Sequence, residues 1–396
     1  MRRACLGLFL CSSFLWAGSA QKSTELIITN VNVVDTRYGG IQPNVTVIVK
    51  DGVIVAVTKV AILNTGPNVQ ILNAGGTYLI PGLWDMNAHL RNSVVGTWDR
   101  DALLSLYVSN GVTGILDLDS TEKTSASRLD PEIILAGPAQ SFAASPLFER
   151  HSVAGLNEIL VACSYVSKDA DALPIEHPDT LAQAWVTEES DAPYDRKKAW
   201  DLFLKMSDHA TWMVPSLISL QTVPEVSTSS EVSATARASA PDGPNAHSSE
   251  IPASADAMLA FNLVSGMRRA GVQFLAGTNG PGADLMPGSS LHQELELLVA
   301  SGFSPLQALQ TATFNPALSM AKLDKYGVVE ANHIANLVLL EANPLTEIRN
   351  TRKIVGVIVR GIYLSRTDLN TMLAKAEHDL NPQPDTARAG ELKTTP

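Results

Sequence analysis

Cysteine is scarce in this sequence, and its placement excludes whole classes of protein. The 396 residues contain three cysteines, and Cys5 and Cys11 both lie within the first twenty positions. A disulfide-stapled scaffold and a paired-cysteine metal site are therefore excluded, because both need several cysteines at short spacings. The remaining Cys163 is expected to be a free, buried thiol.

Positive charge is scarce as well. Lysine and arginine number 29 against 40 aspartates and glutamates, which gives a formal net charge of -11. This balance argues against a nucleic-acid partner, because phosphate binding needs a clustered excess of basic side chains. The sequence also lacks a phosphate-binding glycine loop and a nucleophile elbow. With 45% hydrophobic residues it has the composition of an ordinary globular protein with a sizeable core.

The first twenty residues have the pattern of a secretory signal peptide. An arginine pair precedes an apolar run at 4–16, and small residues at 17–20 stand before Gln21. The run is shorter than the roughly 20 residues that span a bilayer, so a cleaved leader is favoured over a membrane anchor. The mature chain has no later segment that could span a membrane, and we expect export to a periplasm or to the outside.

Runs of β-branched residues near both ends of the chain predict an all-β unit. Between residues 25 and 80, short runs alternate with turns at 39–40 and 51–52. Similar runs return at 335–340 and 354–359, and the two sets can pair into one small sheet module that flanks a central domain. Between them, apolar strands alternate with amphipathic helices, which predicts an α/β architecture.

Three segments carry the polar residues that indicate chemistry. Two are strands with polar ends, and the third is a helix pair; they read Leu79-Ile80-Pro81-Gly82-Leu83-Trp84-Asp85-Met86-Asn87-Ala88-His89-Leu90, Phe274-Leu275-Ala276-Gly277-Thr278-Asn279, and 302–316 with its Thr-Ala-Thr-Phe-Asn-Pro end. Alternate residues of a strand point the same way, so Asn87 and His89 face one place at the end of the first strand.

Together these segments resemble the amidohydrolase superfamily, in particular its imidazolonepropionase-like and exported dipeptidase-like branch. The likeness covers most of 25–366 and includes Gly327-Val328-Val329-Glu330 followed by 335–340. It implies a TIM-like (β/α) barrel in which a Pro-Gly-Leu-x-Asp-x-His-x-His strand gives two imidazoles to a Zn²⁺-type ion. An Asp after a Gly-Thr dipeptide shuttles the proton while metal-bound hydroxide attacks a carbonyl, and a lysine and further histidines come from the strands between.

The resemblance divides the chain into consecutive parts. We expect a signal peptide at 1–20, the N-terminal part of a β-sandwich at 21–80, a barrel at 81–326 with a low-complexity loop at 222–256, the C-terminal part of the sandwich at 327–366, and a loose tail at 367–396. The loop is rich in Ser, Ala, Pro and Thr, so it buries too little apolar surface to offset the entropy of ordering.

Two positions depart from the family pattern. Asn87 stands where the first imidazole is expected, and its neutral amide oxygen is a poor substitute for a ring nitrogen on Zn²⁺. Asn279 stands where the catalytic Asp is expected, and it has neither a negative charge nor a titratable proton. Asn279 is therefore a degraded catalytic position, and Asn87 a degraded metal-binding one.

The middle of the chain departs further. Between Ile134 and Glu176 no strand carries the family's lysine, and Lys168 lies in a polar stretch. About 40 residues remain where two strand–helix units of 30 or more each are expected, so the sequence leaves open whether the barrel is complete. His177, in Pro174-Ile175-Glu176-His177, does resemble a ligand strand of the family.

Three histidines follow from the resemblance as site candidates. His89 and His177 are the surviving metal-ligand positions, and His292 is expected either to support the ligands without binding the ion or to cap a helix. Two imidazoles without an anionic partner make a weak site, because catalytic Zn²⁺ has at least three protein ligands. We therefore expect Zn²⁺ or another divalent ion to be weakly bound or absent.

Two functions remain open from the sequence. One is metal-dependent hydrolysis of C–N bonds in a cyclic amide or dipeptide-like substrate, impaired by the lost ligands. The other is a non-catalytic relative that uses the barrel pocket for binding or assembly. The expected partner is a small amide or peptide if the protein is active, with no nucleic acid, and a homo-oligomer is left open.

Overall fold

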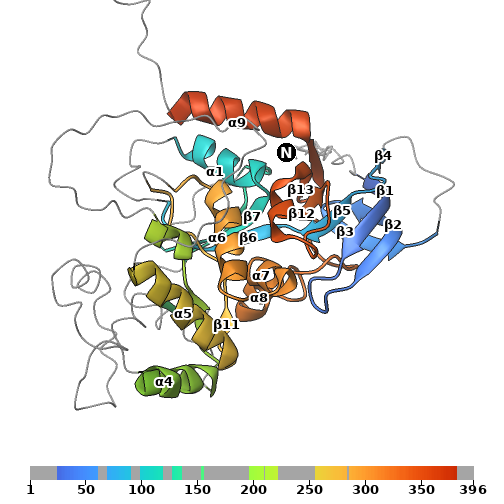
Figure 1. Cartoon of the computed structure of the whole chain (residues 1–396). Helices are drawn as coiled ribbons and strands as arrows, with labels where there is room; N and C mark the ends of the chain where they lie inside the picture. The colour runs from blue at the N-terminus through green and yellow to red at the C-terminus, as the bar shows by residue number, and fades with distance from the viewer. Residues whose placement is uncertain are drawn as a thin grey trace, which may run out of the picture.

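A computed structural model gives the fold and describes residues 25–60, 69–90, 99–118, 127–135, 153–155, 196–208, 210–221, 255–282 and 285–380 (Figure 1). Within these ranges, strands and helices make a mixed α/β protein. No helix among them is long and apolar enough to cross a bilayer. The expected signal peptide, the expected loop from 222 to 254, and positions 381–396 lie outside the described residues.

Strands from both ends of the chain share one eight-stranded sheet. Its order is β14-β13-β12-β5-β1-β2-β3, with β4 paired to β1. The strands are β1 (Glu25–Val34), β2 (Ile41–Lys50), β3 (Val53–Thr58), β4 (Val69–Asn73), β5 (Tyr78–Pro81), β12 (Leu337–Leu340), β13 (Ile354–Val359) and β14 (Ile362–Ser365). The junction is β5, which runs parallel to β1 and antiparallel to β12.

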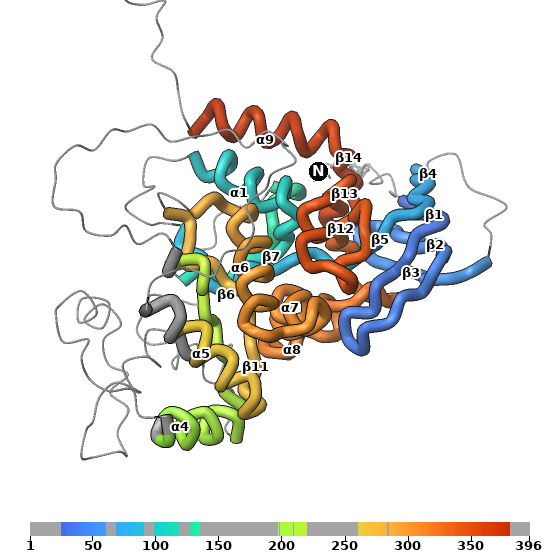
Figure 2. The backbone as a smooth tube through the Cα atoms, in the orientation of Figure 1, coloured from blue at the N-terminus to red at the C-terminus, as the bar shows by residue number. Residues whose placement is uncertain are grey.

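This sheet corrects one expectation. The sequence suggested a β-sandwich, but the described strands at the two ends form a single hydrogen-bonded sheet, because β5 offers one edge to β1 and the other to β12. Figure 2 shows the blue N-terminal and red C-terminal parts lying side by side. Alternating residues such as Leu26, Ile28 and Val47 bury one face of the sheet in a common core with Leu339 and Ile358.

Two tight turns explain how the ends of the chain meet. Asp51 and Gly52 both have positive φ, 50° and 84°, as a two-residue hairpin turn between β2 and β3 requires. A Cβ at Gly52 would lie 2.9 Å from the carbonyl oxygen of Arg360, and one at Gly361 would lie 2.9 Å from the Cα of Gly52. The turn before β3 and the turn before β14 therefore pack backbone to backbone, which a larger side chain would prevent.

Six parallel strands form the central part. They lie in two three-stranded sheets, β6-β7-β8 and β11-β10-β9. Their bounds are β6 (Leu83–Ala88), β7 (Val112–Asp117), β8 (Glu132–Leu135), β9 (Val153–Gly155), β10 (Trp212–Val214) and β11 (Gln273–Phe274). Backbone hydrogen bonds join the two sheets between β6 and the chain that follows β11, with Met86 N–H donating to Ala276 O at 2.9 Å.

The last of these strands thus lies beside the first, which is the neighbour relation that a closed barrel requires. The described residues trace an arc of six strands and do not trace its closure between β8 and β9. In the stretch between Ile134 and Glu176, where no lysine-bearing strand was expected, the structure describes β9, whose three residues include no lysine.

Helices cover the arc and the sheet. Those described are α1 (Arg100–Ser109), α4 (Arg196–Asp208), α5 (Ala255–Arg269), α6 (Ser289–Ala300), α7 (Pro305–Thr311), α8 (Phe314–Ser319) and α9 (Arg366–Leu380), with short 3₁₀ turns η4 (Leu217–Gln221) and η5 (Ile348–Arg352). Helix α5 begins at Ala255, so Ala255 and Asp256 are helical although the sequence assigned them to the low-complexity loop.

Helix α9 corrects the expectation of a loose tail at 367–396. It runs to Leu380 and lies along α1 (Figure 1). Leu369 and Ala376 are buried, and Ala376 packs in one cluster with Ala102 and Leu106 of α1. The polar composition of this segment misled the prediction, because its few apolar residues recur at helical spacing and find a partner helix.

Candidate active site at the ends of the parallel strands

The polar ends of β6 and β11 meet, as the sequence motifs require. The backbone N–H of Asn279 donates to the carbonyl of Asn87 at 2.8 Å, and the N–H of His89 donates to the carbonyl of Gly280 at 2.7 Å. Gly277 allows this approach, since a Cβ there would lie 2.6 Å from the Cβ of Asn87. We call this meeting point, residues 85–89 and 277–280 with Ser216 beside them, the mouth.

Asp85 locks the two strand ends together. Its Oδ2 accepts the Thr278 hydroxyl at 2.6 Å, and its Oδ1 accepts the N–H groups of Thr278 at 3.0 Å and Asn87 at 3.1 Å. Burial raises the pKa of this carboxyl to about 6, against the lowering effect of these hydrogen bonds and of nearby His89. The carboxylate therefore bears a desolvation cost that its donors only partly offset.

Asn87 is half-buried and held from one side. Its Nδ2 donates to the hydroxyl of Ser216 at 2.9 Å, which brings in the residue that follows β10 and Pro215. Its Oδ1 is buried and accepts no hydrogen bond from the described residues. A carbonyl-type oxygen is thus left at the mouth with its acceptor capacity unused.

Asn279 takes the left-handed backbone conformation, with φ 55°, and is exposed. Asn adopts this conformation more readily than most residues, and Asp shares the tolerance. The amide side chain cannot take up a proton in the ordinary pH range, so it supplies no general base. His89 is half-buried beside it, close enough for its charge to lower the pKa of Asp85.

His292 lies away from the mouth. Its Nδ1 is 3.0 Å from the Thr351 hydroxyl and its Nε2 is 3.0 Å from the carbonyl of Asn110. Burial, and then the charge of Arg352, lowers its pKa to about 3, so the ring is neutral. Both ring nitrogens are occupied in the packing of α6 against α1 and η5, and neither supports Asn87 or His89.

The described residues do not make a complete metal site. Within the described part of the chain, no group of three or more His, Cys, Asp and Glu side chains is arranged to hold a metal ion. The mouth offers the imidazole of His89 and the unused oxygen of Asn87, fewer than the three protein ligands of catalytic Zn²⁺. His177 and Lys168 lie outside the described residues.

Sequence reasoning missed three residues of the mouth, Asp85, Thr278 and Ser216, and the buried Glu294 of α6, which bonds to Ile218 two residues after Ser216. Asp85 and Thr278 stood inside the motifs but were given no role. Glu294 had a usable signal, because it lies on the apolar face of α6 together with the buried Leu291, Leu295 and Leu298. Ser216 had none, since its contact with Asn87 joins residues 129 positions apart.

Comparison with known protein families finds a match over part of the chain. Residues 201–363 match the amidohydrolase family. Over these residues, the resemblance to the amidohydrolase superfamily is confirmed. No curated protein matches the chain by sequence.

Solved structures show the same fold at low identity. An Xaa-Pro dipeptidase with methionine bound in its active site has 15% identity and a TM-score of 0.53, over 86% of this chain and 100% of that chain. A prolidase complexed with N-methylphosphonate-L-proline has 18% identity and a TM-score of 0.56, over 87% and 100%. Molinate hydrolase has 15% identity and a TM-score of 0.55, over 88% and 96%. The chain has the fold of these amidohydrolases and prolidases.

Proposed function

We propose that this protein hydrolyses C–N bonds in cyclic amide or dipeptide-like substrates, with a rate reduced by the residues at 87 and 279. One observation carries the proposal: the backbones of Asn87 and Asn279 are hydrogen-bonded at 2.8 Å, so the two degraded positions share one mouth. The Xaa-Pro dipeptidase and the prolidase among its structural neighbours support the bond type.

The chemistry of the mouth supports binding more than proton transfer. The exposed amide of Asn279 can donate to the carbonyl of an amide substrate, whereas the Oδ1 of Asn87 is buried and can accept a substrate N–H only after a local movement uncovers it. Hydrolysis also needs water activated by a base, and neither asparagine provides one. A Zn²⁺-type ion at this mouth would need His89, His177 and Asn87 together.

A non-catalytic relative that binds a small molecule in the same pocket is the second candidate. It is favoured by the anchoring of Asn87 to Ser216, which fixes the amide as a hydrogen-bonding group with no charge. It shares the proposed ligand class, and it differs in predicting binding without turnover.

Restoring the family residues separates the two. We expect Asn87→His with Asn279→Asp to raise bound Zn²⁺ towards one per chain and to raise hydrolysis of a panel of lactams and dipeptides by about 100-fold or more, the size of a general-base contribution. Metal content and initial rates are measured on protein loaded with Zn²⁺ or Mn²⁺.

The control is Asn44→His with Asn332→Asp, two exposed asparagines that share the positive φ of Asn279. Detectable hydrolysis by the wild type supports the enzyme. Ligand binding with no turnover in the wild type supports the second candidate. No gain in the restored variant over this control would contradict the proposed mouth.

We also propose that the arc of parallel strands is part of a TIM-like barrel and that the mature chain begins at Gln21 after export. The backbone hydrogen bonds between β6 and the chain after β11 support the barrel. The pattern of the first twenty residues supports export and cleavage before Gln21. N-terminal sequencing of protein secreted from an expressing cell tests the export. A chain that retains Met1 and stays with the cells would contradict it.

A further inference from the structure

The turn after β10 is capped in an unusual way. η4 begins at Leu217, directly after Ser216, whose φ of 46° places it in the left-handed region. The first N–H groups of a helical turn lack acceptors within the turn, and a preceding serine normally supplies one with its hydroxyl. Here the Ser216 hydroxyl accepts the Nδ2 of Asn87 instead. The amides of Leu217 and Ile218 therefore need an acceptor from elsewhere.

Glu294 supplies that acceptor from helix α6. Its Oε2 accepts the N–H of Ile218 at 2.8 Å, and the backbone N–H of Leu217 lies close enough to help lower the pKa of this carboxyl. The side chain is fully buried, and its Oε1 has no partner among the described residues. Burial raises the pKa of Glu294 to about 8, against the lowering effect of the two amides. Burying a carboxyl here costs free energy of desolvation, which indicates that Glu294 has a role beyond packing.

Few charges act on this carboxyl. Asp85 of β6 raises its pKa slightly, and the η4 and α7 segments that pack on α6 contain no ionisable residue. From η5, Arg349 and Arg352 reach α6 but pair with Glu296, whose Oε2 and Oε1 lie 3.4 and 2.6 Å from them. Among the described residues, the carboxylate of Glu294 is therefore stabilised by backbone amides and by no cationic side chain. Its hydrogen bond to the Ile218 amide is the contact that links it to the turn.

We propose that Glu294 is a positioning residue for the mouth: by accepting the Ile218 amide at the start of η4, it leaves the Ser216 hydroxyl to hold the Asn87 side chain with Oδ1 unused. This inference rests on the proposed function, because that function places the substrate at the mouth. Without the carboxyl, the nearest replacement acceptor for the Ile218 amide is Ser216 itself. Ser216 then releases Asn87, whose amide turns.

Three variants of the full chain test this. Glu294→Leu removes the acceptor, Glu294→Gln keeps a neutral oxygen of the same shape, and Glu296→Gln makes the same amide change two residues away on α6, where the partners are arginines. NMR follows the Asn87 side-chain NH₂ signals and the exchange of the Leu217 and Ile218 amides. These readouts need no turnover, so they remain informative if the protein proves not to be an enzyme.

In Glu294→Leu we expect the Asn87 signals to move and the exchange of the Ile218 amide to rise about tenfold, the change that loss of one buried hydrogen bond produces. Glu294→Gln should keep the Asn87 signals in place, and Glu296→Gln should leave both readouts as in the wild type. Unmoved Asn87 signals in a folded Glu294→Leu would overturn the proposal, as would equal changes in Glu296→Gln.

A pH titration covers the case in which Glu294→Leu does not fold. In the wild type, the Ile218 amide proton should shift between about pH 6 and pH 10 as its acceptor ionises, and Glu294→Gln should abolish that shift. A shift that persists in Glu294→Gln, or an Ile218 amide that does not respond in the wild type, would show that this carboxyl does not hold the turn.

Discussion

Asp85 is a charged side chain in a strand whose neighbouring residues are buried. It is tolerated because Thr278 and Asn87 donate three hydrogen bonds to it, and its pKa still rises to about 6. A carboxyl whose folded pKa is raised binds its proton more tightly in the folded state than in the unfolded one. Its contribution to stability is complete below its unfolded pKa and is lost as the pH rises through 6.

This gives the first prediction. We expect the free energy of unfolding of the wild type, minus that of Asp85→Asn, to fall by up to roughly 3 kcal/mol as the pH rises from about 4 to about 7. The amide of the variant can still accept from the two N–H groups and donate to the Thr278 hydroxyl. Urea unfolding at several pH values measures the difference.

The control carries the opposite sign. Asp368 has a pKa lowered by its hydrogen bonds from Ser365, so its stabilisation is lost as the pH falls. The difference between the wild type and Asp368→Asn should therefore rise with pH. Parallel trends in the two variants would show that burial of Asp85 does not govern its titration.

The residues of the mouth differ in how far the sequence predicts them. Asn87, His89 and Asn279 could be placed because each lies in a short motif on one strand. The bonds from Asn87 to Ser216 and from Ile218 to Glu294 could not, because they join positions 129 and 76 residues apart. His292 stood in a motif as well, but its neighbours Asn110 and Thr351 come from segments that no local pattern links to it.

Among the elements, α9 shows what composition alone conceals. Its exposed face is polar except for Ala374, and its contact with α1 depends on a few small or apolar residues. Ala376 is 1% exposed, whereas Ala374 on the same helix is exposed. Because Ala376 and Ala374 have the same side chain on the same helix, one substitution made at both positions isolates the effect of burial.

We expect Ala376→Asp to lower the free energy of unfolding by about 3 kcal/mol or more, since it buries an unpaired carboxylate against α1. Ala374→Asp shares the helix-propensity cost of at most about 0.7 kcal/mol and should add little else. Thermal unfolding of both variants gives the comparison. If the two lose equal stability, α9 is not docked as described.

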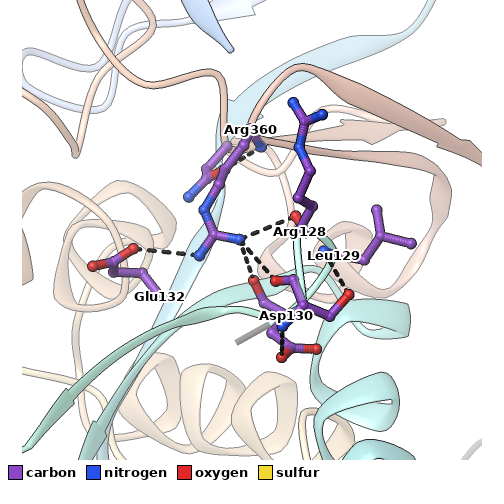
Figure 3. A network of polar contacts seen from close by, with 7 residues as sticks. Arg128, Leu129, Asp130, Glu132 and Arg360 are labelled. Atoms are coloured by element: carbon purple, nitrogen blue, oxygen red, sulfur yellow. Dashed lines mark hydrogen bonds and ion pairs between the residues drawn. The ribbon is translucent and has the colours of Figure 1, made fainter. Parts of the chain in front are cut away.

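At the scale of the whole molecule, Arg360 ties the sheet to the parallel strands. From the turn between β13 and β14, its Nη1 donates to the carbonyls of Arg128 and Asp130, both at 3.0 Å, and of Ser127 at 3.4 Å (Figure 3). Its Nη2 lies 3.4 Å from Glu132, the first residue of β8. One guanidinium thus joins a C-terminal hairpin to the start of a central strand.

Lysine cannot reproduce this contact, because a single ammonium does not span the carbonyls and the carboxylate together. We expect Arg360→Lys to cost about 1–2 kcal/mol in urea unfolding, the value of one or two lost hydrogen bonds of a charged donor. Arg37→Lys, which alters one exposed ion pair with Glu330, should cost less. Equal losses would show that the carbonyl contacts contribute nothing.

The overall fold was predictable in class and in part of its layout. Alternating strands and helices indicated an α/β protein, and the β-branched runs located strands near both ends. Pairing of the two sets of runs into one sheet module was anticipated, but the strand order in that sheet and the arc of six strands were not, because partners such as β5 and β12 lie more than 250 positions apart. Local patterns fix which residues form a strand, whereas distant packing selects its neighbour.

The pairing of β5 with β12 also constrains how the protein is made. On a ribosome, the strands before residue 81 emerge early, yet one edge of β5 has no partner until residues 337–340 have been synthesised. An open, apolar strand edge invites association with other chains during that interval. Chaperone binding to nascent chains should therefore be strongest before the last sixty or so residues appear outside the ribosome, and a permuted gene that brings β12 next to β5 should shorten the dependence.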